Sequence, residues 1–269
     1  MSALRSRVIM TSLLPALVYA SAAVFLVGMG WRLAAWLRAP VPLNIVLTPG
    51  PATAAGVTRR LGGEALLFRS LFGADRWLWV AAWVFHISLV LLAVGHVAGL
   101  VVPELARASL GLTEDQFHQL AEVTGGVFGV LAVVPLLCLL LRRLTMERLR
   151  YISTFSDYFA LALLLLVIAT GDQMRFMGAL DLARARQFVS GLLSFHPVAP
   201  PSDTAFVAHL LLVCALLAYI PFSKLVHLGG LLLSPTLNQR NNAREHRHVG
   251  PWDRLQAGGS PISSQGPRA

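Results

Sequence analysis

Residues 77–102 read WLWVAAWVFHISLVLLAVGHVAGLVV, without a single Asp, Glu, Lys or Arg. An α-helix rises about 1.5 Å per residue and the hydrocarbon core of a bilayer is about 30 Å thick, so a spanning helix needs about 20 mostly apolar residues. This stretch is long enough, and only His86, Ser88 and His96 interrupt its apolar character. It therefore predicts a transmembrane helix that carries two histidines.

Four further windows of the chain are long and apolar enough to cross a bilayer. They cover residues 8–30, 121–141, 154–177 and 204–225, and we expect the last to continue through Pro221 toward His227. Asp157 and Asp172 bound the apolar part of window 154–177, so we expect both carboxylates near the membrane interfaces, where they stay hydrated. The sequence therefore predicts an all-α membrane protein with five transmembrane helices in a bundle.

The composition agrees with a membrane protein and argues against other classes. Hydrophobic residues make up 56% of the 269 residues and charged residues 13%, about half the charged fraction of a soluble domain. The mean hydropathy of +0.66 argues against a water-soluble enzyme and against a disordered chain. Cys138 and Cys214 lack a CxxC spacing, so we expect neither a disulfide framework nor a thiolate metal site.

The basic residues are distributed unevenly between the two ends of the predicted helices. Sixteen of the 22 Lys and Arg residues lie in segment 31–76, in the turn after the third helix and in the tail from Lys224 onward. By the positive-inside rule this side is cytoplasmic, which places the N-terminus outside and the C-terminus in the cytoplasm. The net charge of +9 is therefore a topology signal, and we set nucleic-acid binding aside.

The first window has a second interpretation. Arg5 and Arg7 oppose the orientation just given, and together with the apolar run behind them they resemble a cleavable secretory signal. The run continues through Val27, however, and is longer than a usual signal core. We therefore expect a spanning helix there.

Two segments lack the apolar pattern of the predicted helices. Residues 39–63 are rich in Pro and Gly and predict an irregular cytoplasmic loop. From residue 234 onward the chain becomes polar. We therefore divide the chain into a five-helix membrane domain, residues 1–233, and a partly flexible cytoplasmic tail, residues 234–269. The tail carries basic residues and is a candidate docking segment for a partner: Arg240, Arg244 and Arg247.

Four of the eight histidines fall in or at the ends of predicted helices, where ionisable residues are costly and mark candidate functional sites. His86 and His96 are ten residues apart, about 15 Å along a helix, and His209 and His227 are eighteen apart, about 27 Å. Because the two helices run in opposite directions, His96 matches His209 in depth and His86 matches His227. Two pairs at two depths predict two metal centres stacked across the bilayer.

The ligand types favour haem over other metal sites. Each pair offers two imidazoles without a nearby carboxylate or thiolate to complete a zinc or an octahedral site. Two imidazoles from facing helices suit the axial positions of a haem, whose porphyrin supplies the other four ligands. No CxxCH motif is present, so we expect b-type haem without covalent attachment and electron transfer as its function.

Other interpretations of these residues stay open at this point. Each histidine alone could be a buried side chain bonded to a backbone carbonyl. The whole chain could be a cofactor-free scaffold or a transporter whose histidines relay protons, although the lack of an internal repeat argues against it. Five glycines either let a flat macrocycle approach the helices or serve close helix packing: Gly95, Gly99, Gly125, Gly126 and Gly129.

Long stretches of the chain resemble a known family. FHISLVLLAVGHVAGLVVPE (85–104) and AFVAHLLLVCALLAYIPFSKLVHL (205–228) resemble the respiratory nitrate reductase gamma subunit family of dihaem cytochromes b. Within that family, three further phrases look most like the membrane cytochrome subunit of the Dsr complex of sulfur metabolism. They read SDYFALALLLL (156–166), IPFSKLVHLGGLLLSPTLN (220–238) and NNAREHRHVGPW (241–252).

The resemblance implies cofactors and ligands. It implies two haems b, with His86 and His227 on the inner haem and His96 and His209 on the outer one, in agreement with the depth pairing. It also implies menaquinone or ubiquinone as substrate at the outer haem. The implied place is the cytoplasmic (inner) membrane, where the chain would be a multi-pass electron-transfer subunit.

The resemblance also implies partners. The Dsr branch pairs this subunit with a cytoplasmic iron–sulfur protein resembling heterodisulfide reductase, and with periplasmic cytochrome c and iron–sulfur subunits and a second membrane subunit. The alternatives within the family are a gamma subunit of respiratory nitrate reductase and the cytochrome b of a heterodisulfide reductase.

One departure from the family pattern concerns the quinone. The nitrate reductase branch has a lysine important for quinol in the loop after the second helix, and ungapped counting from His96 reaches Gln116 instead. His118, two residues on in the expected outer loop, is a possible substitute because an interfacial histidine can move protons near neutral pH. The candidate quinone contacts are therefore Gly95, Gln116 and His118. Lys224 is expected either to pair with a propionate of the inner haem or to extend to the membrane interface.

Overall fold

The computed structural model describes residues 12–39, 46, 49–178 and 180–242, and this part of the chain is helical without strands. Five of its helices are long and apolar enough to cross a membrane, as predicted. They are α2 (Leu14–Arg38), α5 (Arg76–His96) with the π turn η2 (Val97–Val101), α7 (Glu114–Thr145), α9 (Phe155–Met177), and α11 (Thr204–Tyr219) with the 3-10 turn η3 (Ile220–Phe222).

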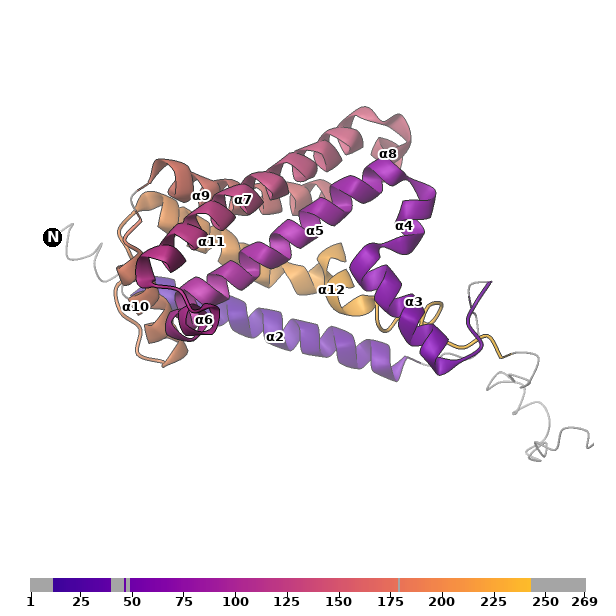
Figure 1. Cartoon of the computed structure of the whole chain (residues 1–269). Coiled ribbons are helices and arrows are strands. Elements are labelled where there is room, and N and C mark those ends of the chain that lie inside the picture. The colour runs from indigo at the N-terminus through magenta and orange to yellow at the C-terminus, as the bar shows by residue number, and fades with distance from the viewer. Residues whose placement is uncertain (1–11, 40–45, 47–48, 179, 243–269) are drawn as a thin grey trace, which may run out of the picture. The chain divides into compact units, whose positions relative to one another are not determined.

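The chain divides into two compact units. The first comprises Met1–Gly30 and Ser70–Val226, and the second comprises Trp31–Arg69 and His227–Ala269. In the first unit, α5 packs against α7, α7 against α9, and α9 against α11, so these four helices lie side by side in chain order (Figure 1).

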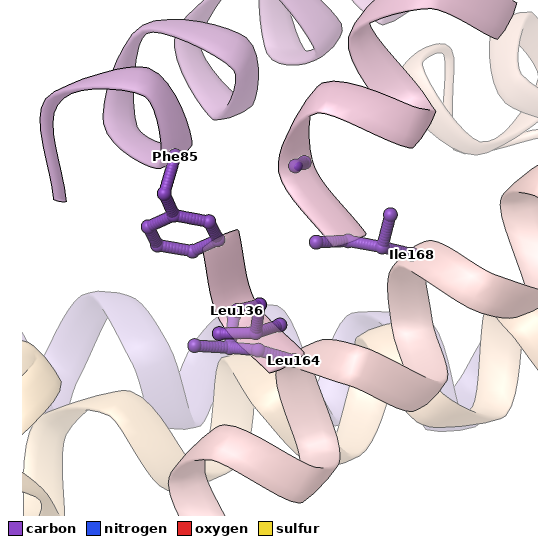
Figure 2. Close-up of a cluster of buried hydrophobic side chains, with 5 residues drawn as sticks. Phe85, Leu136, Leu164 and Ile168 are labelled. Atoms are coloured by element: carbon purple, nitrogen blue, oxygen red, sulfur yellow. The ribbon is translucent and has the colours of Figure 1, made fainter. Parts of the chain in front are cut away.

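A small apolar cluster joins α5, α7 and α9. Figure 2 shows Phe85 of α5 and Leu136 of α7 beside Leu164 and Ile168 of α9, and Ala132 completes the cluster. In the most apolar window of each spanning helix only 11–28% of the residues are buried within the protein. Most residues of these helices therefore keep part of their surface exposed, as expected for helices that contact lipid.

The first part of α2 also belongs to the first unit. The Tyr19 hydroxyl donates a hydrogen bond to the carbonyl oxygen of Leu192, at 2.8 Å, in α10 (Leu182–Leu193). Farther along α2, Gly28 lies against the ring of Pro221 in η3. A β-carbon at Gly28 would come within 2.7 Å of Pro221 Cβ, so this contact requires glycine.

The second unit contains the last turns of α2, helix α3 (Ala54–Leu67) and the short helix α12 (His227–Gly230). Gly230 packs against the ring of Trp36. The Asn241 backbone N–H donates to the Pro51 carbonyl oxygen at 2.8 Å. The division of the chain at residue 233 into membrane domain and tail stays a prediction, and residues 243–269 lie outside the described part.

The helix that was predicted to begin at residue 121 begins at Glu114. The Thr113 hydroxyl accepts from the Gln116 backbone N–H, and the Gln116 side chain accepts from the Thr113 N–H, which is a capping box. Expecting Gln116 and His118 in an outer loop was therefore wrong, because both lie in the first turns of α7. The capping box fixes a helix start ahead of the apolar run.

The predicted loop at 39–63 is also wrong in part. Helix α3 begins at Ala54, where the Thr53 side chain accepts from the Gly56 N–H at 3.1 Å, and it runs through Gly62 and Gly63. The N-cap at Thr53 and the amphipathic pattern of the segment thus stabilise a helix despite the low helix propensity of its glycines. Four more short helices connect the spans: α4 (Arg69–Ala74), α6 (Pro103–Leu110), α8 (Glu147–Ile152) and α10.

Two span boundaries differ from the prediction. Helix α2 continues past residue 30 to Arg38, and the expected start of this window at residue 8 lies outside the described part. Helix α11 ends at Tyr219, because Pro221 cannot donate a backbone hydrogen bond and Ser223 adopts an extended conformation (φ −121°, ψ 175°). His209 and His227 therefore do not lie on one straight helix, so the 27 Å separation, which assumed such a helix, stays a prediction.

Candidate functional site

The rings of His96 and His209 lie close together in the first unit. His96 is the last residue of α5, and His209 lies in the second turn of α11. Their ring centroids are 6.3 Å apart and the ring planes differ by 13°. The structure thus brings together the two histidines that the depth argument paired.

Hydrogen bonds define the tautomers of both rings. His96 Nδ1 lies 2.7 Å from the Leu92 carbonyl oxygen, and His209 Nδ1 lies 3.0 Å from that of Val167. A carbonyl oxygen can only accept, so Nδ1 carries the proton in each ring and Nε2 carries the lone pair. This is the usual arrangement of metal-ligating histidines, whose second ring nitrogen donates to a carbonyl or carboxylate.

The separation of the two rings is compatible with both imidazoles holding one metal ion. With metal–nitrogen bonds of about 2.0 Å, two imidazoles on opposite sides of one metal ion have ring centres roughly 6 Å apart. The observed separation of 6.3 Å agrees with that value. Among the described residues no group of three or more His, Cys, Asp or Glu side chains could hold a metal ion. A pair of imidazoles is the donor set that haem needs, because the porphyrin supplies the remaining ligands.

The five glycines fall into two groups. In α7, a β-carbon at Gly125 would contact Arg175, one at Gly126 would contact Phe176, and one at Gly129 would overlap the Asp172 carboxylate. These three glycines serve close packing of α7 on α9. On the α5 side, a β-carbon at either Gly95 or Gly99 would meet nothing within 4 Å. The two glycines next to His96 therefore border open space.

A π turn follows His96 directly. Residues Val97–Val101 form it, and the Arg186 side chain of α10 donates through Nε to the Gly99 carbonyl oxygen at 2.8 Å. π turns often occur at functional sites, since they re-aim the residues around them. The apolar run continues unchanged through Val97–Val101, so the sequence pattern did not predict the π turn.

His86 and His227 are described in different units. His86 lies half-buried on α5, with Nδ1 at 2.7 Å from the Ala82 carbonyl oxygen, so its Nδ1 also carries the proton. Its ring meets that of Phe85 edge to face. His227 is the first residue of α12 and is exposed. Pairing of these two histidines stays a prediction.

Lys224 pairs with a carboxylate of the protein. Its Nζ lies 2.7 Å from Asp157 Oδ1, and Arg143 Nη1 lies 3.7 Å from Asp157 Oδ2. Asp157 is also the third residue of α9 and completes a capping box there, since its carboxylate accepts from the Thr154 backbone N–H at 2.9 Å. With only 7% of its surface exposed, Asp157 is buried and neutralised instead of hydrated, contrary to expectation. Lys224 and Asp157 are 67 positions apart in the sequence. Spacing along the chain therefore could not predict that the two side chains pair.

One of the three candidate quinone residues, His118, lines a small pocket. His118 lines it together with residues that the sequence did not single out: Glu104, Arg107, Glu114, Phe117 and Arg186. His118 Nδ1 lies 4.0 Å from Glu122 Oε1, and both side chains are exposed. Arg107 Nη2 lies 2.8 Å from Glu104 Oε2. The hydrogen bond from Arg107 and its positive charge hold the pKa of the Glu104 carboxyl below its usual range. Gln116 is exposed and is already used in the capping box.

Comparisons with known proteins agree with this arrangement. The family described as nitrate reductase gamma subunit matches residues 67–237. A Hdr-like menaquinol oxidoreductase cytochrome b-like subunit of Archaeoglobus fulgidus is 33% identical in an alignment 279 positions long, which covers 87% of this chain and 81% of the relative. The nitrate reductase gamma chain of Bacillus subtilis is 30% identical over 158 residues, covering 56% of this chain and 71% of the relative. The respiratory nitrate reductase 1 gamma chain of Escherichia coli is 30% identical over 159 residues, covering 55% of this chain and 70% of the relative.

Proposed function

The chain belongs to the nitrate reductase gamma subunit family, and from this membership we propose that it is the dihaem cytochrome b subunit of a quinone-linked membrane complex. It is a multi-pass membrane protein. Its work is to transfer electrons between the quinone pool and a cytoplasmic iron–sulfur subunit. The observation that carries the proposal is the His96–His209 pair, with ring centroids 6.3 Å apart and both Nδ1 atoms bonded to carbonyl oxygens.

His96 and His209 hold the outer haem in this proposal. When bound, the haems would supply one-electron oxidation and reduction, and His96 and His209 would hold one of them through Nε2. The protein contributes two ring nitrogens whose lone pairs are fixed by hydrogen bonds on the other side of each ring. Open space beside Gly95 and Gly99 allows a flat macrocycle to approach α5.

His86 and His227 hold the inner haem. His86 lies ten residues before His96 on the continuous helix α5, which is about 15 Å along its axis. Two centres at that separation divide the roughly 30 Å of hydrocarbon into shorter electron-transfer steps. Family membership and the tautomer of His86 support this assignment. Lys224 pairs with Asp157, so a haem propionate would be a second partner for its ammonium group.

The quinone side lies at the outer haem, with the N-terminus outside and the C-terminus in the cytoplasm. Oxidation of one quinol releases two electrons and two protons, so this end needs both an electron acceptor and proton acceptors. His118 and Glu122 are exposed at the start of α7 and serve as the proton acceptors. Gly95 borders the open side of α5, and Gln116 holds the helix start that carries His118. Relatives named as menaquinol oxidoreductase subunits favour menaquinol over ubiquinol.

The partner on the cytoplasmic side is an iron–sulfur subunit resembling heterodisulfide reductase. Relatives described as Hdr-like support this choice, and they match 87% and 88% of the chain. Periplasmic cytochrome c and iron–sulfur subunits and a second membrane subunit complete a Dsr-type complex. A nitrate reductase complex is the second candidate, because nitrate reductase gamma chains match more than half of the chain. Co-purification separates the two, since a molybdenum-cofactor protein indicates nitrate reductase.

The test is a haem count on the purified protein. A reduced-minus-oxidised spectrum with a pyridine haemochrome assay is expected to give two haems b per chain. His96→Ala and His227→Ala should each lose one haem. His196→Ala is the matched control, because His196 is exposed and its Nδ1 bonds only to the nearby Ser194 carbonyl oxygen at 2.8 Å. Two haems in both ligand variants would overturn the ligand assignment, and no haem in the parent protein would favour a scaffold or transporter.

A further inference from the structure

The ring of His209 is held by a neighbouring helix, whereas the rings of His86 and His96 are each held by their own helix. His86 and His96 each bond through Nδ1 to the carbonyl oxygen four residues earlier on their own helix. His209 Nδ1 instead reaches across to α9, where it lies 3.0 Å from the Val167 carbonyl oxygen and 3.1 Å from Thr170 Oγ1. A helix that carries no proposed ligand therefore sets the position of this ring.

The Thr170 hydroxyl acts as an acceptor toward His209. Thr170 Oγ1 lies 2.8 Å from the Leu166 carbonyl oxygen and 2.9 Å from that of Val167. Because a carbonyl oxygen only accepts, the hydroxyl proton is used within α9. Its lone pair then faces His209 Nδ1, which must donate. Two acceptors on α9 thus hold the Nδ1 proton of a single imidazole.

The backbone of α9 also lies near the same ring. Gly171 follows Thr170 directly, and a β-carbon at Gly171 would lie 3.5 Å from His209 Cε1 and 3.8 Å from Nδ1. The imidazole therefore lies beside the Gly171 position of α9. Val167 and Thr170 together define the tautomer of the ring.

We propose that Thr170 is a positioning residue that fixes His209 and lowers the redox potential of the outer haem. This inference rests on the proposed function. A hydrogen bond accepted from the distal N–H of a ligating imidazole increases the basicity of that imidazole and orients the ring. A more basic axial ligand stabilises the oxidised iron relative to the reduced iron, which lowers the potential.

The decisive variant is Thr170→Val, which keeps the branched shape and removes the hydroxyl. The full chain is used in membranes or in its complex, and both haems are followed by potentiometric titration of their visible bands and by low-temperature EPR. We expect the potential of one haem to rise while the other stays unchanged, together with a shift of one low-spin EPR signal. Thr170→Ser restores the hydroxyl and should return both readouts to the parent values.

Thr124→Val is the matched control. Thr124 Oγ1 also bonds to a carbonyl oxygen four residues earlier, that of Leu120 at 2.6 Å, on another spanning helix. Its removal should leave both potentials unchanged. If Thr170→Val holds two haems at parent potentials, or if Thr170→Ser behaves like Thr170→Val, the role of Thr170 is refuted. A parent protein without two haems would instead refute the proposed function.

Discussion

Gly28 and Gly30 lie two positions apart on α2, yet only one of them has a close neighbour. A β-carbon at Gly28 would come within 2.7 Å of Pro221 Cβ and 2.9 Å of Cγ, whereas one at Gly30 would meet nothing within 4 Å. The proline ring is rigid and almost fully buried, so it cannot move aside. Gly28→Ala should therefore cost about 1–3 kcal/mol of stability by overpacking.

Gly30→Ala is the control on the same helix. Alanine favours a helix over glycine by up to about 1 kcal/mol, so this variant should be neutral or slightly more stable. Thermal unfolding of both variants in one detergent compares them. Equal unfolding temperatures would show that the contact between α2 and Pro221 does not hold in the membrane protein.

His118 is the residue on which the proposed quinol chemistry depends most. Its side chain is exposed at the pocket between α6 and α7, and its Nδ1 lies 4.0 Å from Glu122 Oε1. His118→Gln keeps a hydrogen-bonding side chain but cannot take up a proton near neutral pH. Loss of a general base should slow quinol-dependent haem reduction at least about tenfold while both haems stay bound. Stopped-flow reduction by a menaquinol analogue measures this, and an unchanged rate would exclude His118 from the proton path.

At the scale of elements, Asp157 joins three segments of the first unit. It caps α9, pairs with Lys224 of the 3-10 turn η4 (Lys224–Val226) and lies near Arg143 of α7. Asp157→Asn removes the charge that neutralises two cations. The Lys224 side chain is 71% exposed, so the cost should be about 1–3 kcal/mol, below that of a fully buried pair.

Glu104→Gln provides the comparison for an exposed pair. Glu104 and Arg107 lie 2.8 Å apart on α6, and the Glu104 side chain is 80% exposed. Such an exposed pair contributes little to stability, because water and salt screen it. Denaturant or thermal unfolding should rank Asp157→Asn well below Glu104→Gln in stability. The reverse order would mean that the Asp157 network does not stabilise the end of α9.

The extent of each element could be predicted only where length and apolar character decide it. All five spans follow from those two properties, because crossing the hydrocarbon requires about 20 apolar residues. The start of α7 at Glu114 depends instead on one capping box, and the end of α11 depends on Pro221 and the extended Ser223. Both signals are local and present in the sequence. The predicted boundaries instead followed the ends of the apolar runs, which lie elsewhere.

At the scale of the whole molecule, the pairing of His96 with His209 could be predicted from the sequence. The contacts from α9 that hold the His209 ring could not. Depth follows from helix direction and rise, so two histidines on antiparallel helices can be matched without coordinates. The azimuth of α9 does not follow from its apolar pattern, because most of its surface is apolar. Thr170 and Gly171 beside His209, and Lys224 beside Asp157, depend on that azimuth and emerged only from the structure.

The C-terminal tail offers a test of partner docking. Arg240 is described, whereas Arg244 and Arg247 lie outside the described residues. Truncation after Asn238 removes all three and is expected to reduce co-purification of the iron–sulfur subunit while both haems stay bound, since the four histidines precede the cut. Quantitative mass spectrometry of the purified complex measures the ratio. Undiminished co-purification would place docking elsewhere on the protein.

The order of electron transfer across the membrane gives the last prediction. With quinol at the outer end and the partner at the inner end, His96→Ala should abolish reduction of the remaining haem by quinol. His227→Ala should leave the outer haem reducible by quinol and stop delivery to the iron–sulfur subunit. Rapid-mixing spectroscopy distinguishes these two defects. Quinol is supplied as the electron donor, and an acceptor that takes electrons from the iron–sulfur partner is added to the same complex. If His227→Ala blocked quinol oxidation while His96→Ala allowed it, the two haems would be assigned in the wrong order.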